Sequence, residues 1–138
     1  MLILCNYPDQ FKKDAKLEFK WLNENGTIDD FNRLNALLTR LTASVEATKE
    51  IRALSNNKNA SVFVAAFKAF TESGMEDTAF GKFLAWFVNG GNETEIDGNT
   101  WDAIGIDRSS RDTGVVHKKV EYLVSLMEQY FEEIRKAA

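Results

Sequence analysis

ASVFVAAFKAFTESGMEDTAFGKFLAWFVNGG, residues 60–91, is the stretch that decides the fold class. Apolar side chains recur in it every three or four residues, which is the spacing of one helix face. Ser61 is suited to cap the first of two helices, while Gly74 and Gly90-Gly91 are suited to end them. Because the connection between the helices is short, we expect an antiparallel pair. Their inward stripes are Phe63, Ala66, Phe67 and Phe70 in the first helix and Phe80, Phe83, Leu84 and Phe87 in the second.

Amphipathic helices are also predicted on both sides of this pair. In residues 27–45 the helical pattern is clear, with Thr27 as cap, and it weakens through 46–54 before a polar break at 55–59. Residues 113–136 carry a seam with a period of 3.5 residues, typical of a bundle helix or a coiled coil, and we favour a bundle helix. The first stripe is Ile28, Phe31, Leu34, Leu38, Leu41 and Val45, and the seam is Val116, Val120, Leu123, Met127, Tyr130 and Ile134.

Two less regular segments complete the predicted fold. MLILCNY, residues 1–7, is a short strand or an apolar arm packed on the body. A helix then starts at Pro8, where a missing N–H costs nothing, and ends at Gly26 in a left-handed conformation. Its apolar face would be Phe11, Ala15, Phe19 and Leu22.

The dipeptide Asp97-Gly98 predicts a two-residue hairpin turn. We therefore expect a small ribbon over Thr94 to Trp101, packed on the helices because an isolated ribbon is marginally stable. The predicted fold class is all-α, with residues 1–138 forming a single helical domain. It is a compact bundle of about five to six helices with a small β-hairpin insert near residues 94–101.

The composition suits such a domain and narrows the function classes. Of the 138 residues, 44% are hydrophobic and only one is proline, which favours a helical core. A net charge of −4 does not favour a general nucleic-acid binder, because such proteins usually carry a basic excess. With one cysteine, Cys5, the chain has no internal disulfide. No secretory signal or membrane span is visible, so we expect a cytoplasmic protein with no membrane association.

Motifs that would indicate catalysis are missing. The sequence holds no Walker loop, GxGxxG, GxSxG or HExxH pattern. The single histidine, His117, cannot form a Glu-x-x-His di-iron motif because the position three residues earlier is Gly114. A calcium loop over residues 93–104 fails because Ile104 stands where a bidentate glutamate is required. We therefore predict no catalytic residue, no metal site and no cofactor.

DRSSRDTGVVHKK, residues 107–119, is the best candidate for a binding site. Its four basic and two acidic residues make it net positive within a negative chain, and the start of a helix attracts anions through free N–H groups. The structural alternative is that Asp112 or Thr113 caps the helix and that Asp107 and Asp112 pair with the arginines. The candidate anion- or nucleic-acid-binding residues are Arg108, Ser109, Ser110, Arg111, His117, Lys118 and Lys119.

FLAWFV, residues 83–88, is apolar on nearly every side of its helix. A helix of this kind is either central in its domain or covered by a partner. Aromatic side chains at helical spacing more often belong to a core, and both interpretations stay open from the sequence. The candidate partner-binding residues are Phe83, Trp86, Phe87 and Trp101.

These observations favour a non-enzymatic helical protein–protein interaction module whose partner is another protein or a second copy of the chain. The alternative is a nucleic-acid-associated or regulatory protein of a mobile genetic element that uses the basic helix start at residues 108–119. It would also use Lys12, Lys13, Lys16 and Lys20 if these lie on the same side. A third hypothesis is an enzyme or small-ligand binder with an anionic substrate at the same stretch.

Overall fold

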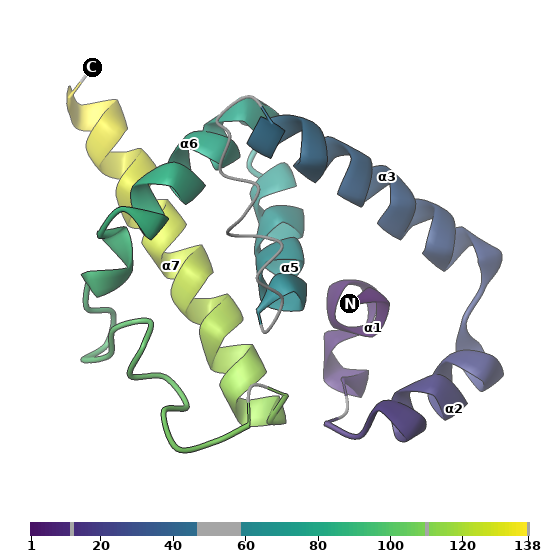
Figure 1. Ribbon diagram of the computed structural model, residues 1–138. Coiled ribbons are helices and arrows are strands. Elements are labelled where there is room, and N and C mark those ends of the chain that lie inside the picture. Colours follow the sequence, from purple (N-terminus) through teal and green to yellow (C-terminus); the bar gives the residue numbers. More distant parts are fainter. Residues whose placement is uncertain (12, 47–58, 110, 138) are drawn as a thin grey trace.

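The computed structural model describes residues 1–11, 13–46, 59–109 and 111–137. Within these ranges the chain is all-α and has no strand, which confirms the predicted fold class (Figure 1). Most of the predicted continuation and break at 46–59 lies outside the described residues, as do Lys12 and Ser110. The helices are α1 (Leu2–Asn6), α2 (Ala15–Asn25), α3 (Ile28–Glu46), α5 (Ala60–Thr71), α6 (Asp77–Val88) and α7 (Thr113–Ala137), with the short 3₁₀-helices η1 (Pro8–Gln10) and η2 (Gly91–Glu93).

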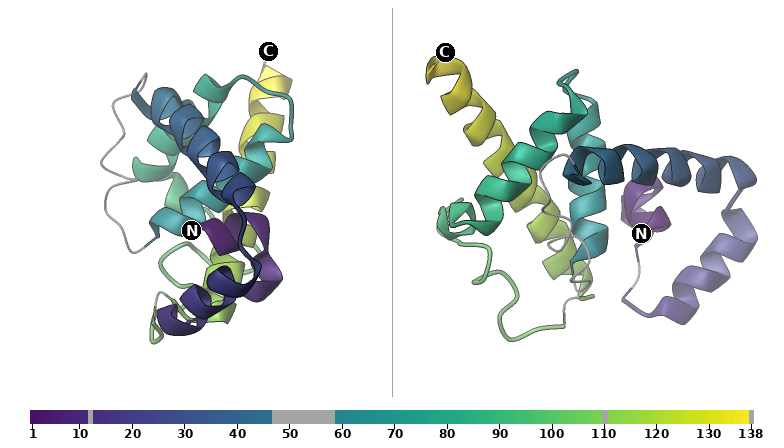
Figure 2. Two further views of the ribbon diagram at one scale, coloured as in Figure 1. Left: turned by 90° about the vertical axis from the view of Figure 1, so that its right-hand side faces the viewer. Right: turned by 45° about the horizontal axis from the view of Figure 1, so that its top comes forward.

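The helices form a packed body and a projecting arm. Helix α7 packs along α5, and the C-terminal part of α3 packs on α6. Helix α1 contacts both α5 and α3, and α2 lies beyond it, so that α3 and α2 form an arch around α1 (Figures 1 and 2). We call α2 with the first turn of α3, residues 15–31, the arm.

A cluster of phenylalanine rings forms the centre of the body. Phe67, Phe80 and Phe83 have no exposed surface, and all eight residues of the two predicted stripes are buried. The ring of Phe63 lies 5.8 Å from that of Phe87, and the ring of Phe70 lies 5.5 Å from that of Phe80. These contacts run in opposite order along α5 and α6, as expected for an antiparallel pair.

Helix α7 follows its predicted seam only in part. Leu123 and Met127 are buried, but Ile134 is 49% exposed, while Tyr122 and Leu126, which are not in the seam, are buried. A straight α-helix turns by about 20° per heptad relative to a 3.5-residue repeat. The predicted seam therefore rotates away from α5 towards the C-terminal end of α7.

The predicted β-hairpin at 94–101 is wrong, although its turn is present. Ile96 and Asn99 exchange two backbone hydrogen bonds of 2.8 and 3.0 Å, closing an isolated antiparallel bridge. Asp97-Gly98 between them has two positive φ angles, 51° and 82°, as this turn requires. The pairing stops there because the Trp101 N–H donates to the Asn92 carbonyl instead, and the Trp101 ring is buried in the aromatic cluster.

The N-terminal predictions need two corrections. Residues 1–7 form no strand. The alternative, an apolar N-terminal segment packed on the body, is confirmed, because Leu2–Cys5 are buried in α1. The helix predicted from Pro8 is broken: η1 ends at Gln10, and α2 begins only after Asp14, whose carboxylate accepts from the Lys16 N–H at 2.8 Å. This break separates Phe11, which is buried, from the register of α2, and Phe19 is 67% exposed.

Two predicted helix ends also differ in the structure. Gly26 has φ −71° rather than a left-handed conformation. Its requirement for glycine is steric, because a Cβ there would lie 2.7 Å from the Leu22 carbonyl oxygen. At α5 the N-cap is Asn59 rather than Ser61, and the Asn59 side chain accepts a hydrogen bond from Lys119 instead of capping the helix.

Asp30 is a buried carboxylate that ties α1 to the start of α3. Its Oδ2 accepts from the Thr27 N–H at 2.9 Å, and its own N–H donates to the Thr27 hydroxyl at 3.2 Å, which confirms Thr27 as the cap. The Tyr7 hydroxyl donates to the other carboxylate oxygen at 2.9 Å. The Thr27 hydrogen bond is the main reason that the pKa of Asp30 is lowered, and the bond to Asp30 raises the pKa of Tyr7.

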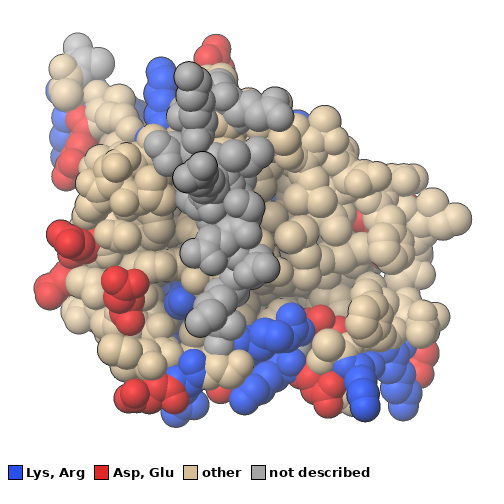
Figure 3. All heavy atoms as spheres, in the orientation of Figure 1, with Lys and Arg blue, Asp and Glu red and all other residues tan. Residues whose placement is uncertain are grey.

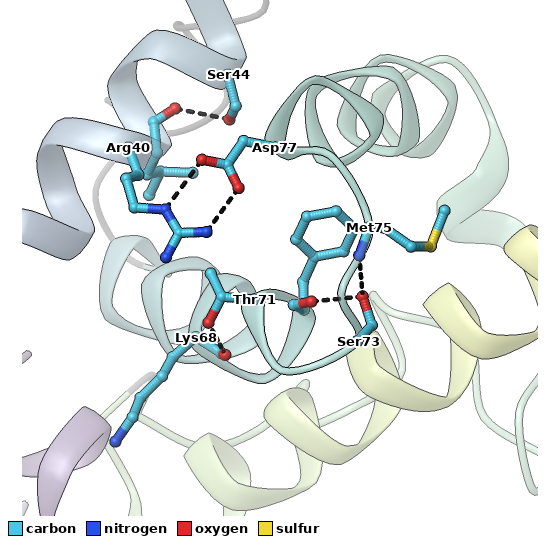
Figure 4. A network of polar contacts seen from close by, with 9 residues as sticks. Arg40, Ser44, Lys68, Thr71, Ser73, Met75 and Asp77 are labelled. Carbon is cyan, nitrogen blue, oxygen red and sulfur yellow. Dashed lines mark hydrogen bonds and ion pairs between the residues drawn. The ribbon is translucent and has the colours of Figure 1, made fainter.

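A second polar link joins α3 to α6 (Figure 4). Arg40 donates from Nε and Nη2 to the two carboxylate oxygens of Asp77, at 3.0 and 2.8 Å. The two parallel bonds are the strongest geometry for this pair, and they lower the pKa of Asp77. Nearby, the Ser73 hydroxyl donates to the Phe70 carbonyl and accepts from the Met75 N–H, which fixes the connection between α5 and α6.

Replacing a ring of the central cluster should lower the free energy of unfolding far more than replacing an exposed ring. We expect Phe83→Ala to lower the free energy of unfolding by about 3–5 kcal/mol, because it leaves a cavity in a packed core. The matched variant Phe19→Ala should change it by less than about 0.5 kcal/mol. Urea unfolding followed by circular dichroism measures both values, and similar losses for the two variants would contradict the placement of the rings.

The Asp30 carboxylate should make stability depend on pH. Its folded-state pKa lies below the unfolded value of about 3.9. The stabilisation is therefore fully present above that value and disappears as the pH falls through the folded pKa. We expect Asp30→Asn to lower the urea midpoint at pH 7. The difference in midpoint between the variant and the parent chain should shrink as the pH falls below about 4. Asp9→Asn, at an exposed carboxylate, serves as control, and an Asp30→Asn deficit that persists unchanged at low pH would refute the link.

Candidate functional site

The basic stretch at residues 107–119 contains the capped start of α7. The Asp112 carboxylate accepts from the backbone N–H groups of Gly114 and Val115, at 3.0 and 3.3 Å. These bonds, that of Val115 first, lower the pKa of Asp112, and the cations Arg108 and Lys13 add to the effect. A carboxylate of the chain therefore occupies the position at which the free N–H groups of a helix start would bind an anion.

The two arginines of this stretch have separate acidic partners. Arg108 is 70% exposed and lies 3.7 Å from the Asp112 carboxylate, as the structural alternative predicted. Arg111 pairs with Glu18 of α2 instead, at 3.0 Å, and its Nε donates to the Lys13 carbonyl at 3.0 Å. Its guanidinium also lies 5.4 Å from the centre of the Phe11 ring. Arg111 thus joins the start of α7 to the start of the arm.

The remaining candidate residues of the stretch each make different contacts. Lys119 donates to the Asn59 side chain at 3.0 Å and lies 4.6 Å from the centre of the Trp101 ring. His117 is half-buried, and its ring lies 6.4 Å from the ring of Phe11 and nearly perpendicular to it. The Ser109 hydroxyl accepts from the Arg111 N–H, and Ser110 is outside the described residues.

Lys118 is exposed and borders a depression of about 400 Å³ between residues 96–104 and α7. Glu121 and Tyr122 lie in the same wall, and the Tyr122 hydroxyl already donates to the Thr94 carbonyl at 2.7 Å. Of the basic residues in the stretch, Lys118 alone lines this depression. The stretch therefore supplies one cation here rather than a converging set.

Of the lysines near the start of α2, Lys13 lies beside the basic stretch, while Lys16 and Lys20 lie about 160° around the helix from Glu18, which faces Arg111. The Arg111 contacts with Glu18 and the Lys13 carbonyl bring the start of α2 against the start of α7. Figure 3 shows Lys and Arg side chains along the lower edge of the molecule, from α7 to α2, with Asp and Glu side chains among them. The edge is therefore of mixed charge.

The four aromatic candidates for partner binding belong mainly to the core. Phe83, Phe87 and Trp101 are buried, and Trp86 is half-buried with its ring 4.9 Å from that of Tyr130. The apolar helix 83–88 is therefore central in the fold, covered by α3, α5 and α7 of the same chain. Of the four, Trp86 alone leaves part of its side chain uncovered.

The exposed apolar surface lies on the arm, where the sequence did not indicate it. Within the described ranges, four of the seven exposed large apolar side chains fall between residues 17 and 31. Helix α2 has no buried residue. A signal for this was available, since Leu17, Phe19, Trp21 and Leu22 together spread over about 200° of the helix circumference and cannot all face the core. The exposed fractions are 52% for Leu17, 67% for Phe19, 81% for Ile28 and 55% for Phe31.

An apolar groove of about 310 Å³ lies at the other end of the body, between α5 and α7. Its walls include Phe70, Met75, Met127 and Phe131, and its rim carries Glu128, Glu132 and Arg135. Glu128 and Glu132 are exposed, and Arg135 pairs with Glu132 at 3.6 Å.

Within the described part of the chain, no group of three or more His, Cys, Asp or Glu side chains is arranged to hold a metal ion. None of the described helices has the length and apolar character needed to cross a membrane. Comparisons with protein-family models, with curated proteins and with solved structures find no match to this chain.

The Arg111–Glu18 pair should couple the arm to the body measurably. Glu18 is only 14% exposed, so we expect a coupling energy of about 1–2 kcal/mol in a double-mutant cycle with Arg111→Gln and Glu18→Gln. The exposed pair Arg33–Asp29, at 2.6 Å on α3, should give about 0.3–0.5 kcal/mol. Urea unfolding of the variants measures both couplings. A value for Arg111–Glu18 no larger than that of the exposed pair would contradict this role.

Proposed function

We propose that this chain is a non-enzymatic helical protein–protein interaction module that contacts its partner through the arm. The observation that carries the proposal is the exposure of Leu17, Phe19, Ile28 and Phe31 on two successive helices. Single exposed apolar residues are ordinary on a protein surface, but four large ones within 15 residues are typical of an interaction site.

The construction of the arm supports the same proposal. The body closes its aromatic core without α2, which contributes the half-buried Trp21 and Leu22 but no buried residue. The arm is held by polar links at its two ends, Arg111–Glu18 and Tyr7–Asp30. A helix fixed in position by its ends, with apolar side chains left in solvent, is suited to present those side chains to another protein.

A nucleic-acid-associated role, as in a regulator of a mobile genetic element, is the second candidate. The observation in its favour is that Lys13, just before the arm, lies beside Arg111 through its backbone carbonyl, on the same edge as Arg108. The acidic residues on that edge and the pairing of Arg111 with Glu18 favour the protein-interaction proposal. Salt-sensitive binding of DNA or RNA that weakens in Arg108→Ala would favour the second candidate instead.

Replacing the exposed apolar side chains of the arm should remove partner binding. We expect the variant Leu17→Ser, Phe19→Ser, Ile28→Ser, Phe31→Ser to lose at least about tenfold in partner recovery, because burying one such side chain contributes about 1.5–3 kcal/mol. The measurement is affinity purification of the tagged full chain from its host with quantitative mass spectrometry, counting untagged copies of the chain among the partners. The control variant, Val88→Ser with Ile106→Ser, removes exposed apolar side chains outside the arm and should keep the partners. Equal recovery by both variants would refute the proposal.

A further inference from the structure

We infer that the partner of the arm is a second copy of this chain, and that the arm docks into the groove between α5 and α7 of that copy. This inference rests on the proposed function and adds the identity of the partner and its docking site. It is carried by two surfaces of one molecule that match each other in apolar character and in charge.

The exposed face of α2 carries a short row of charges with apolar residues on both sides. Lys16, Lys20 and Glu24 are exposed and lie four residues apart, so they form one stripe along the helix. At 100° per residue, Leu17 and Phe19 lie on either side of that stripe. The arm therefore presents two cations followed by one anion, with an apolar side chain on each flank.

The rim of the groove carries the opposite charges in the same order. Glu128, Glu132 and Arg135 lie four and three residues apart on one face of α7. If α2 lies parallel to α7, Lys16 faces Glu128, Lys20 faces Glu132 and Glu24 faces Arg135. This three-position match is the charge complementarity that selects a second copy as the occupant.

The groove also suits the apolar part of the arm. Met75, Val124 and Phe131 are half-buried in its walls and leave apolar surface uncovered. A volume of about 310 Å³ is at the lower end of the range for ligand pockets, so it fits inserted side chains better than a large ligand. A phenylalanine such as Phe19 is the kind of residue that anchors an interface when it enters such a groove.

The positions of the two surfaces determine the kind of assembly. The arm lies at one end of the molecule, and the groove lies near the C-terminal end of α7, on the opposite side of the body (Figure 1). A chain therefore cannot fill its own groove with its own arm. Docking between copies is head-to-tail, and such contacts continue from copy to copy into an open chain or a closed ring.

Mixing two variants tests this arrangement directly. The arm variant is Leu17→Ser with Phe19→Ser, and the groove variant is Glu128→Lys with Glu132→Lys. All four side chains are exposed, and urea midpoints near that of the parent chain check that both variants fold. By sedimentation velocity over a range of concentrations, we expect the parent chain to form assemblies larger than a dimer and each variant alone to weaken self-association at least tenfold.

An equimolar mixture of the two variants should form a 1:1 complex and nothing larger, because one intact arm meets one intact groove. The control Glu93→Lys with Glu95→Lys makes the same charge change outside the groove and should assemble like the parent. Three results would overturn the inference: a strictly monomeric parent chain, a groove variant that assembles like the parent, or a mixture that stays monomeric. If the arm still recovers a different protein from the host, the proposed function survives and only the identity of the partner is wrong.

Discussion

The packing of α5, α6 and α7 around the rings of Phe67, Phe80 and Phe83 is the constraint on which the structure depends. These three side chains are fully enclosed, and each touches at least one other ring of the cluster. Aromatic pairs at such distances contribute beyond the area that they bury. This packing sets the position of α7. The contact between the buried Trp101 and Tyr122 then holds the irregular residues 94–109 against α7. The same packing also explains why most of the apolar helix 83–88 is covered within the chain itself.

The arm follows from the same constraint because the core is complete without it. Helix α3 packs on α6 with its C-terminal half, where Leu41 and Val45 are buried, and its first turns extend beyond the body. Helix α2, which precedes α3 in the chain, lies beside α1 (Figure 2), and the ring of Trp21 is 4.9 Å from that of Tyr7. Polar links and the half-buried Trp21 and Leu22 hold this region, while its other large apolar side chains stay exposed.

The sequence predicted the packed body well and the binding surface poorly. Helix bounds and the buried stripes of α5 and α6 follow from local spacing, and so does the positive-φ turn at Asp97-Gly98. That turn does not extend into a hairpin because Trp101 is buried in the aromatic core. Local sequence spacing does not predict this contact. The pairing of Arg111 with Glu18 spans 93 positions and could not be distinguished from pairing with Asp112. The exposed face of the arm was missed because Phe19 and Phe31 stand in stripes that look buried until the helices are placed in space.

The body should open only by global unfolding, whereas the arm should open on its own. Hydrogen exchange of the full chain, read for each helix at low protein concentration, measures this difference most directly. We predict that the amides of α5 and α6 exchange only at the rate of global unfolding, while those of α2 exchange at least about a hundredfold faster, a difference of about 2.7 kcal/mol in opening free energy. Equal protection of α2 and α6 would show that the arm belongs to the core, and it would contradict the account.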